Sequence, residues 1–165
     1  MTNLYLATDH AGFTLKERLK TFLIPNYNVC DFGPYMYDPD DDYPDFITLA
    51  ARGLQKDVED GITDSCGIIL GGSGQGEAMC ANRFPGIRAV VYYGDGMRVV
   101  DGKVYDIVAL SREHNDANVL SIGARFVDLD KIFLVVNQWL QLSFSNDERH
   151  VRRINKLDKL DIMPG

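Results

Sequence analysis

Short apolar runs alternate along the chain with longer segments in which apolar residues recur every three or four positions. The short runs predict strands at 4–7, 27–32, 67–70, 87–92 and 119–122. The helical spacing predicts amphipathic helices at 13–23, 46–54, 78–83, 132–140 and 147–160. Alternation of strands and helices predicts an α/β fold with a parallel sheet covered by helices on both faces. In such a sheet the ligand crevice lies outside the carboxyl ends of the strands.

Length and composition narrow the choice of protein class. The 165 residues predict a single domain, 1–165, with an ordinary apolar fraction of 45%. The net charge of −7 argues against nucleic acid or an anionic membrane as partner. We find no signal pattern and no apolar stretch long enough to span a bilayer. Cys30, Cys66 and Cys80 lack metal-ligand spacing, so we expect reduced thiols in a cytoplasmic protein without a metal site.

The most informative segment follows the third predicted strand. Four of the six residues 71–76 are glycine, and Glu77 comes directly after them. Glycines between a buried strand and a helix offer backbone N–H groups to an oxyanion, and a carboxylate beside such donors can act as a base. A plain strand-to-helix turn is the alternative, although it requires fewer glycines. The loop is not a Walker A motif, because Glu77 and Ala78 stand where that motif has lysine and serine or threonine.

Three further polar groupings are candidates for the same site, and each has a structural alternative. Asp9 and His10 end the first strand, where a helix cap with a surface histidine is the alternative. The polar run 111–118 precedes the fifth strand, where a solvated loop is the alternative. Arg149 and Arg153 lie four residues apart, so a helix presents both on one face, suited to a phosphate dianion or to ion pairs.

The acidic run Asp38–Asp42 resembles a calcium loop only superficially. It lacks the glycine and the terminal glutamate of that pattern. We therefore interpret it as a solvated acidic turn.

Together these segments resemble the sugar-phosphate isomerase family of type B ribose-5-phosphate isomerase and the galactose-6-phosphate isomerase subunits. The matching segments occur in family order over nearly the whole chain. They are 8–13, 42–45, 72–76, 81–89, 111–118 and 149–153.

The resemblance implies a Rossmann-like three-layer αβα sandwich with a five-stranded parallel sheet and a C-terminal helix. It further implies a homodimer, or a dimer of such dimers, with sites shared between subunits. The implied activity is metal-free and cofactor-free aldose–ketose isomerisation of a phosphorylated sugar, with ribose 5-phosphate as the first candidate and a tetrose or hexose phosphate as the alternative.

The resemblance also implies roles for individual residues. The family's base is either a cysteine at the position of Gly71 or a glutamate at the position of Glu77, and this chain has the glutamate. The remaining implied residues fall into three roles, namely oxyanion donors, ring-opening groups and groups that hold the sugar and its phosphate. The donors are Ser73 and the amides around Gly72, Gly74 and Gly76. The ring-opening pair is Asp9 and His114, and hydroxyls are held by Tyr43 and Asn115. The phosphate is held by His10, Arg125, Arg149 and Arg153.

The segment 94–103 departs from the family pattern, because it lengthens the connection after the fourth strand by roughly ten residues. Two interpretations stand equally: a loop that reshapes the sugar pocket, or a hairpin that contacts a second subunit. A non-catalytic phosphosugar-binding module is the competing function. Glu77 argues against it, because a carboxylate repels phosphate but is useful beside an enediol.

Overall fold

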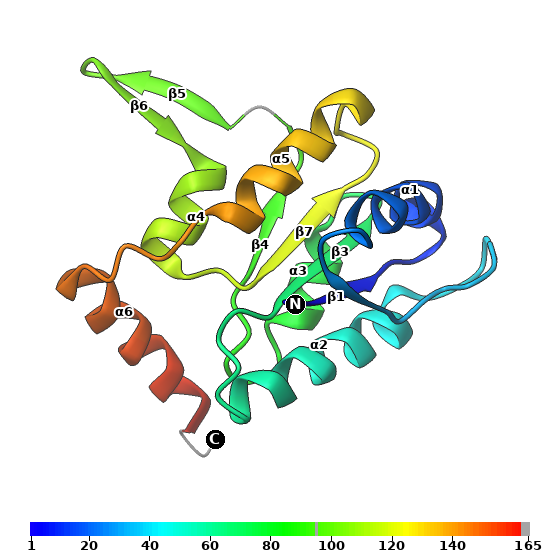
Figure 1. The fold of residues 1–165 in the computed structure, drawn as a ribbon, viewed down its shortest axis with the longest axis horizontal. Helices are drawn as coiled ribbons and strands as arrows, with labels where there is room; N and C mark the ends of the chain where they lie inside the picture. Colours follow the sequence, from blue (N-terminus) through cyan, green and yellow to red (C-terminus); the bar gives the residue numbers. More distant parts are fainter. Residues whose placement is uncertain (95, 163–165) are drawn as a thin grey trace.

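A computed structural model describes residues 1–94 and 96–162. Its main sheet has five parallel strands in the order β2-β1-β3-β7-β4 (Figure 1). In chain order these strands are β1 (Asn3–Ala7), β2 (Asn28–Asp31), β3 (Cys66–Gly71), β4 (Ala89–Tyr92) and β7 (Val119–Gly123). The five predicted strands are therefore confirmed, as is the parallel sheet.

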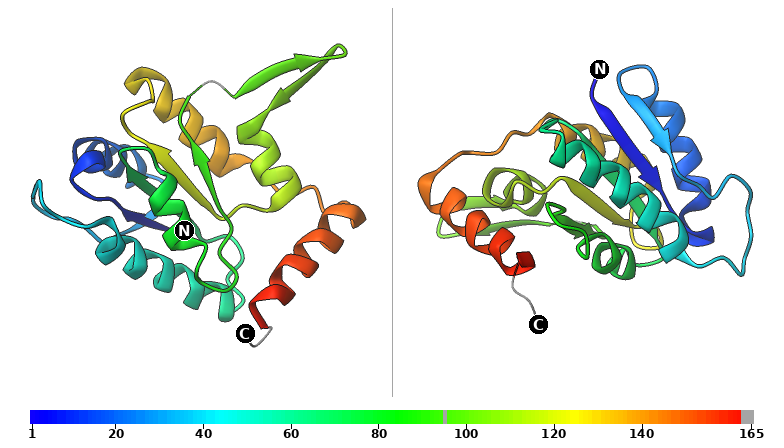
Figure 2. Two further views of the ribbon diagram at one scale, coloured as in Figure 1. Left: turned by 180° about the vertical axis from the view of Figure 1, so that it is seen from behind. Right: turned by 90° about the horizontal axis from the view of Figure 1, so that it is seen from below.

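Helices cover both faces of this sheet (Figure 2). On one face lie α1 (Phe13–Leu23), α4 (Ile107–Asn115) and α5 (Leu129–Gln141), and on the other lie α2 (Tyr43–Glu59) and α3 (Gln75–Ala81). The chain ends in α6 (Glu148–Asp158), and two 3-10 turns complete the helical elements, η1 (His10–Gly12) and η2 (Lys159–Ile162). This is the expected three-layer arrangement with a C-terminal helix.

Alternation along β1 explains how one strand supports both layers. Leu4 and Leu6 pack toward α1 and α5, whereas Tyr5 and Ala7 pack toward α2. The buried Trp139 of α5 belongs to the first layer, where its indole N–H donates to Ser111 Oγ at 3.1 Å. The strands are thus fixed from both sides, which gives the loops at their carboxyl ends a rigid base.

Two elements were not predicted as such. Residues 111–115 belong to α4, so the solvated loop that was the structural alternative for 111–118 is wrong for this part. Asp106 caps the helix by accepting from Val108 N, and Asp116 ends it with a φ of 45°. The apolar residues of this helix, 107–110, all lie in its first turn, so no apolar stripe runs along its length.

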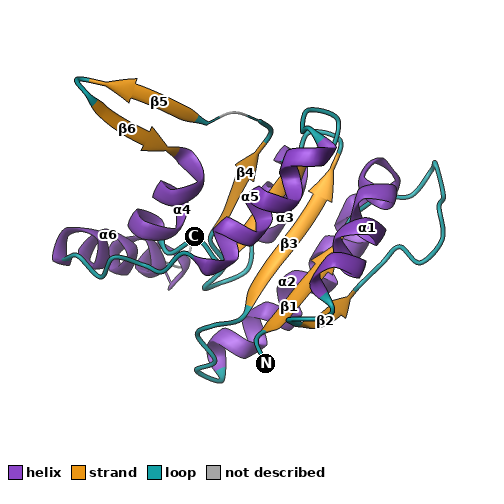
Figure 3. Cartoon of the chain, turned by 45° about the horizontal axis from the view of Figure 1, so that its top comes forward, coloured by secondary structure: helices purple, strands orange, loops and turns teal. Residues whose placement is uncertain are grey.

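The second element is a hairpin made of β5 (Met97–Val100) and β6 (Lys103–Asp106). It is antiparallel and extends away from the main sheet (Figure 3). Of the two interpretations of 94–103, the fold therefore fits a projecting hairpin. In the described part of the chain, no helix is long and apolar enough to cross a bilayer.

Candidate functional site

The glycine loop joins β3 to α3 at the carboxyl end of the sheet. Gly74 begins α3 with a φ of 75°, a left-handed conformation that favours glycine. Because α3 starts at Gln75 and not at 78 as predicted, Glu77 lies in its first turn, where its side chain is only 4% exposed. The loop thus brings a buried carboxylate beside the amide groups of a helix N-terminus.

Three of the glycines make room for a functional side chain. A Cβ on Gly71 would lie 1.8 Å from Glu77 Oε1, and a Cβ on Gly76 would lie 2.8 Å from the ring of Tyr43. A Cβ on Gly72 would lie 3.2 Å from the guanidinium of Arg125. The glycines therefore allow a carboxylate, a phenol and a guanidinium to lie directly against the loop.

Burial raises the pKa of Glu77, and the charge of Asp9 raises it further. Asp9 is itself buried at the end of β1, where its Oδ1 accepts from Ala11 N at 2.9 Å and caps η1. The cap predicted as the structural alternative for Asp9 is thus present, and the same carboxylate influences Glu77. A carboxyl with a raised pKa can both take and return a proton near neutral pH.

His10 is held by a residue that the sequence did not single out. Its ring Nδ1 lies 2.8 Å from Asp41 Oδ1, and its backbone N–H donates to the same oxygen at 2.8 Å. The Asp41 side chain is 8% exposed, so the expectation that 38–42 is a solvated turn is wrong for Asp41. The hydrogen bond to Asp41 raises the pKa of His10, with a further contribution from Asp9.

The glycine-loop cluster lies at the carboxyl ends of β1, β3 and β7, as parallel topology predicts. It contains Asp9, His10, Tyr43, Gly72, Ser73, Gly74, Gly76, Glu77 and Arg125.

The other predicted site residues form a second group, the α4–α6 cluster. It contains His114, Asn115, Arg149 and Arg153, with His150 between them. The rings of His114 and His150 are 4.2 Å apart, and Arg149 Nε donates to His150 Nε2 at 3.0 Å. Because His150 is 3% exposed, burial lowers its pKa, and the nearby His114 and Arg149 charges lower it further. A neutral His150 can accept from Arg149 while its Nδ1 faces Ser145 Oγ at 3.0 Å.

The two clusters lie at opposite ends of the sheet. Helix α4 runs back from the hairpin to the start of β7, so Asn115 lies near the amino end of that strand. Just before β4, Arg88 binds the carboxylate of Asp116, which fixes α4 to this end. One copy of the chain therefore does not bring His114 or Arg149 to Glu77.

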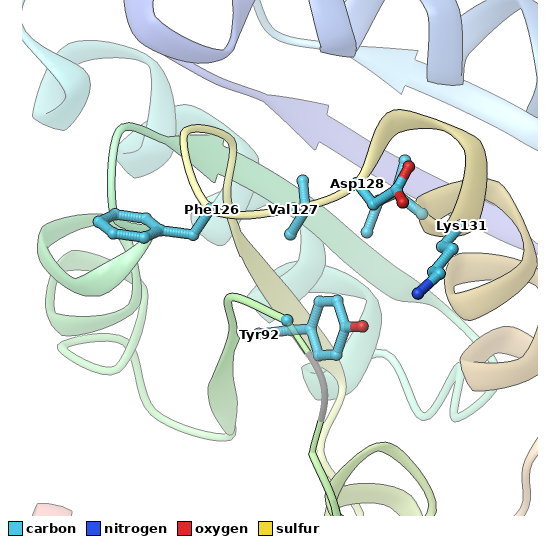
Figure 4. Close-up of a pocket in the computed structure, with 7 residues that line it drawn as sticks. Tyr92, Phe126, Val127, Asp128 and Lys131 are labelled. Atoms are coloured by element: carbon cyan, nitrogen blue, oxygen red, sulfur yellow. The ribbon is translucent and has the colours of Figure 1, made fainter.

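One cavity accompanies the α4–α6 cluster, and a smaller one lies apart from both clusters. One of about 450 Å³ opens between α4, α6 and the start of β4, and His114, Asn115 and Arg153 line it. A smaller one of about 120 Å³ lies between the end of β4 and the start of α5, bounded by Tyr92, Phe126 and Lys131 among others (Figure 4). None of the predicted site residues lines the smaller cavity, so it is not part of the candidate site.

Within residues 1–94 and 96–162, no group of three histidine, cysteine or carboxylate side chains is arranged to hold a metal ion. Sequence reasoning missed Asp41 and His150 as parts of the two clusters. The sequence did not indicate that Asp41 belongs to the site, apart from its closeness to Tyr43, because its partner His10 lies 31 residues away in the chain. His150 stood between the two arginines, and its burial could not be inferred from spacing.

Comparison with known proteins finds relatives over nearly the whole chain. A family model described as Ribose/Galactose Isomerase matches residues 4–157. The probable ribose-5-phosphate isomerase B of Mycoplasma genitalium is 38% identical over 159 residues, covering 94% of this chain and 93% of its own. Ribose-5-phosphate isomerase B of Mycobacterium tuberculosis H37Rv is 36% identical, covering 93% of this chain and 86% of its own.

Solved structures match equally well. A crystal structure of ribose-5-phosphate isomerase B from M. genitalium with bound ribulose 5-phosphate superposes with a TM-score of 0.84 at 32% identity, covering 99% of this chain and 98% of its own. The corresponding enzyme of Clostridium thermocellum gives a TM-score of 0.80 at 34% identity, with 98% of each chain covered.

Proposed function

Because the chain belongs to the ribose/galactose isomerase family, we propose that it interconverts ribose 5-phosphate and ribulose 5-phosphate. The observation that carries the proposal is Glu77, a buried carboxylate held against the glycine loop. Isomerisation removes a weakly acidic proton next to a carbonyl and returns it to the neighbouring carbon. A single carboxyl group with a raised pKa performs both transfers.

In this mechanism Glu77 takes the proton from C2 of the open-chain aldose, and the carbonyl oxygen at C1 gains the negative charge of a cis-enediolate. The amides of the glycine loop and the Ser73 hydroxyl stabilise that charge. Glu77 then returns the proton to C1, and the proton of the C2 hydroxyl passes to the oxygen on C1 as the new carbonyl forms at C2. Tyr43, which lies against Gly76, holds a sugar hydroxyl.

The site is complete only when a second copy contributes the α4–α6 cluster. His114 then faces Asp9 to open the sugar ring, Asn115 holds a hydroxyl, and Arg149 and Arg153 join His10 and Arg125 at the phosphate. The opposite positions of the two clusters in one chain support this homodimer. The three free cysteines are in keeping with a cytoplasmic location.

Proton NMR in D₂O tests the activity directly. The EDTA-treated protein is incubated with tetrose, pentose and hexose phosphates, each in a separate sample. We expect ribulose 5-phosphate to form from ribose 5-phosphate, with deuterium entering the carbon-bound position. Exchange only on a hexose or tetrose phosphate would mean that the proposed reaction is right but its substrate is a different sugar. No exchange on any sugar would favour the non-catalytic binding module.

The β5–β6 hairpin provides a second contact between the copies in this proposal. Met97, Val99 and Val104 share one face of the hairpin, on which their exposed fractions are 62%, 71% and 67%. A two-stranded hairpin with an apolar face is marginally stable until it packs against another surface. It is joined directly to α4, the helix whose opposite end enters the partner's site, so a second copy is the occupant that we assign to this face.

Replacing Val99 and Val104 by threonine is therefore expected to raise the dimer dissociation constant about tenfold or more, because it removes apolar burial while keeping strand propensity. Sedimentation velocity and the loss of specific activity on dilution measure this. Val100→Thr, on the other face of the hairpin, is the matched control. An unchanged dissociation constant in the double variant would rule out the assigned contact.

A further inference from the structure

His10 is held by Asp41 at two points, the backbone N–H and the ring, whereas a surface histidine is usually held at neither. Asp41 Oδ1 lies 2.8 Å from both the ring Nδ1 and the backbone nitrogen of His10. One oxygen thus fixes the backbone position of His10 and the orientation of its ring. Since Nδ1 carries the proton of this hydrogen bond, Nε2 is the ring atom left for a ligand, and the ring retains 29% exposure.

The second oxygen of Asp41, Oδ2, bears on whether His10 is charged. Among the described residues, Asp41 Oδ2 is buried and has no hydrogen-bond partner. A buried carboxylate that lacks partners on one oxygen is costly unless a positive charge lies beside it. Within one chain the charged groups that raise the pKa of His10 are Asp41 and Asp9, and both favour the imidazolium. The arginines that the proposed site places at the phosphate act in the opposite direction until the phosphate dianion neutralises them. The two carboxylates therefore favour the form of His10 in which both ring nitrogens donate.

We propose that Asp41 is a positioning residue that keeps His10 as an imidazolium with its Nε2–H directed at the phosphate of the substrate. This inference rests on the proposed function, since it assigns Asp41 a part in the same phosphate site. The structural alternative is that Asp41 only ties the 33–42 loop to the end of β1. If Asp41 positions His10, the affinity for phosphate depends on the protonation of His10. If Asp41 only ties the loop, it does not.

The test compares Asp41→Asn with Asp40→Asn, which removes the same charge from an exposed position in the same turn. In Asp41→Asn we expect KM for ribose 5-phosphate at pH 7.5 to rise about tenfold, the typical effect of losing a charge-assisted hydrogen bond, while kcat changes by less than about threefold. At pH 5.5, where His10 is protonated in both proteins, the difference in KM narrows. Asp40→Asn keeps the native KM at both pH values, and Asp41→Glu, which retains the charge, restores part of the affinity.

A second readout does not depend on catalysis. The Cε1–H resonance of His10, assigned with a His10→Gln variant, is titrated with and without inorganic phosphate. We expect its midpoint to be lower in Asp41→Asn than in the native and Asp40→Asn proteins, and phosphate to shift it less. An equal midpoint in a folded Asp41→Asn protein, or a KM that rises equally at both pH values, would overturn the proposal. If the native protein isomerises no sugar, the proposed function fails while this titration still decides the role of Asp41.

Discussion

Replacing Glu77 by glutamine is expected to lower kcat by about 10³-fold or more while leaving substrate binding nearly unchanged. General-base catalysis contributes on the order of 10²–10⁴ in rate, and in the proposed mechanism one group performs both proton transfers. Glutamine has nearly the same shape and fills the space over Gly71, so the loop retains its structure. Turnover and deuterium incorporation by NMR measure the loss, and Glu59→Gln, an exposed carboxylate of α2, is the matched control. Near-normal turnover would remove Glu77 as the base.

Glu77→Gln is also expected to change how the free energy of unfolding depends on pH. Because burial raises the pKa of Glu77 above the value of 4.5 that the group has when unfolded, the folded chain binds the proton more tightly than the unfolded chain. The native protein therefore loses stability as pH rises from 4.5 through the folded pKa. Glu77→Gln removes that loss, so its free energy of unfolding should exceed the native value at pH 8 and match it below pH 4.5. Urea unfolding at the two pH values checks this.

The pH dependence of kcat in the native enzyme should reveal the titration of Glu77. Only the deprotonated carboxylate accepts a proton, so kcat falls as pH decreases through the raised pKa of Glu77. An acid limb at the ordinary glutamate pKa would indicate that Glu77 is more hydrated with substrate bound than in the free protein.

The sequence could predict the sheet and the glycine-loop cluster because both follow from short-range rules. Apolar runs locate β1 and β3, and parallel topology then brings Asp9 and Glu77 to one edge, whereas Arg125 entered only through the family resemblance. The contact between Asp41 and His10 could not be predicted, since it depends on how the loop before α2 returns to the end of β1. Acidic composition indicated a solvated turn, and packing decided otherwise for one of its residues.

The second cluster illustrates a different limit of sequence reasoning. Helical spacing correctly placed Arg149 and Arg153 on one helix, but nothing in that spacing indicates which end of the sheet α6 reaches. Helix α5 decides this, because it runs back from the carboxyl end of β7 and α6 follows it, beside α4. The sequence did not reveal α4, because its apolar residues all lie in its first turn. If the two clusters act together across a subunit boundary, as we propose, the sequence carries no signal of their separation within one chain.

Replacing Gly71 by alanine is expected to lower kcat about 100-fold or more, although the substitution leaves every polar group of the site in place. The added Cβ would lie 1.8 Å from Oε1 and 2.0 Å from Cδ of Glu77, so the carboxylate must move. A displacement of about 1 Å in a reacting group is enough to cost on the order of 10² in rate. By the same geometry, a side chain at position 71 and the native position of Glu77 exclude one another. This steric exclusion would explain why the family resemblance implies a base at one position or the other.

Two further variants separate this steric effect from a general loss of structure. Gly72→Ala places a Cβ 3.2 Å from the guanidinium of Arg125, a flexible group that can yield, so KM should rise with little change in kcat. In the Gly71→Ala background, Glu77→Asp shortens the colliding side chain, so its cost in kcat should be smaller than in the native protein. Steady-state kinetics of the four proteins in this double-mutant cycle measure the coupling between the two positions. Strict additivity, or a folded Gly71→Ala protein with native kcat, would mean that the carboxylate does not act from its position against the glycine loop.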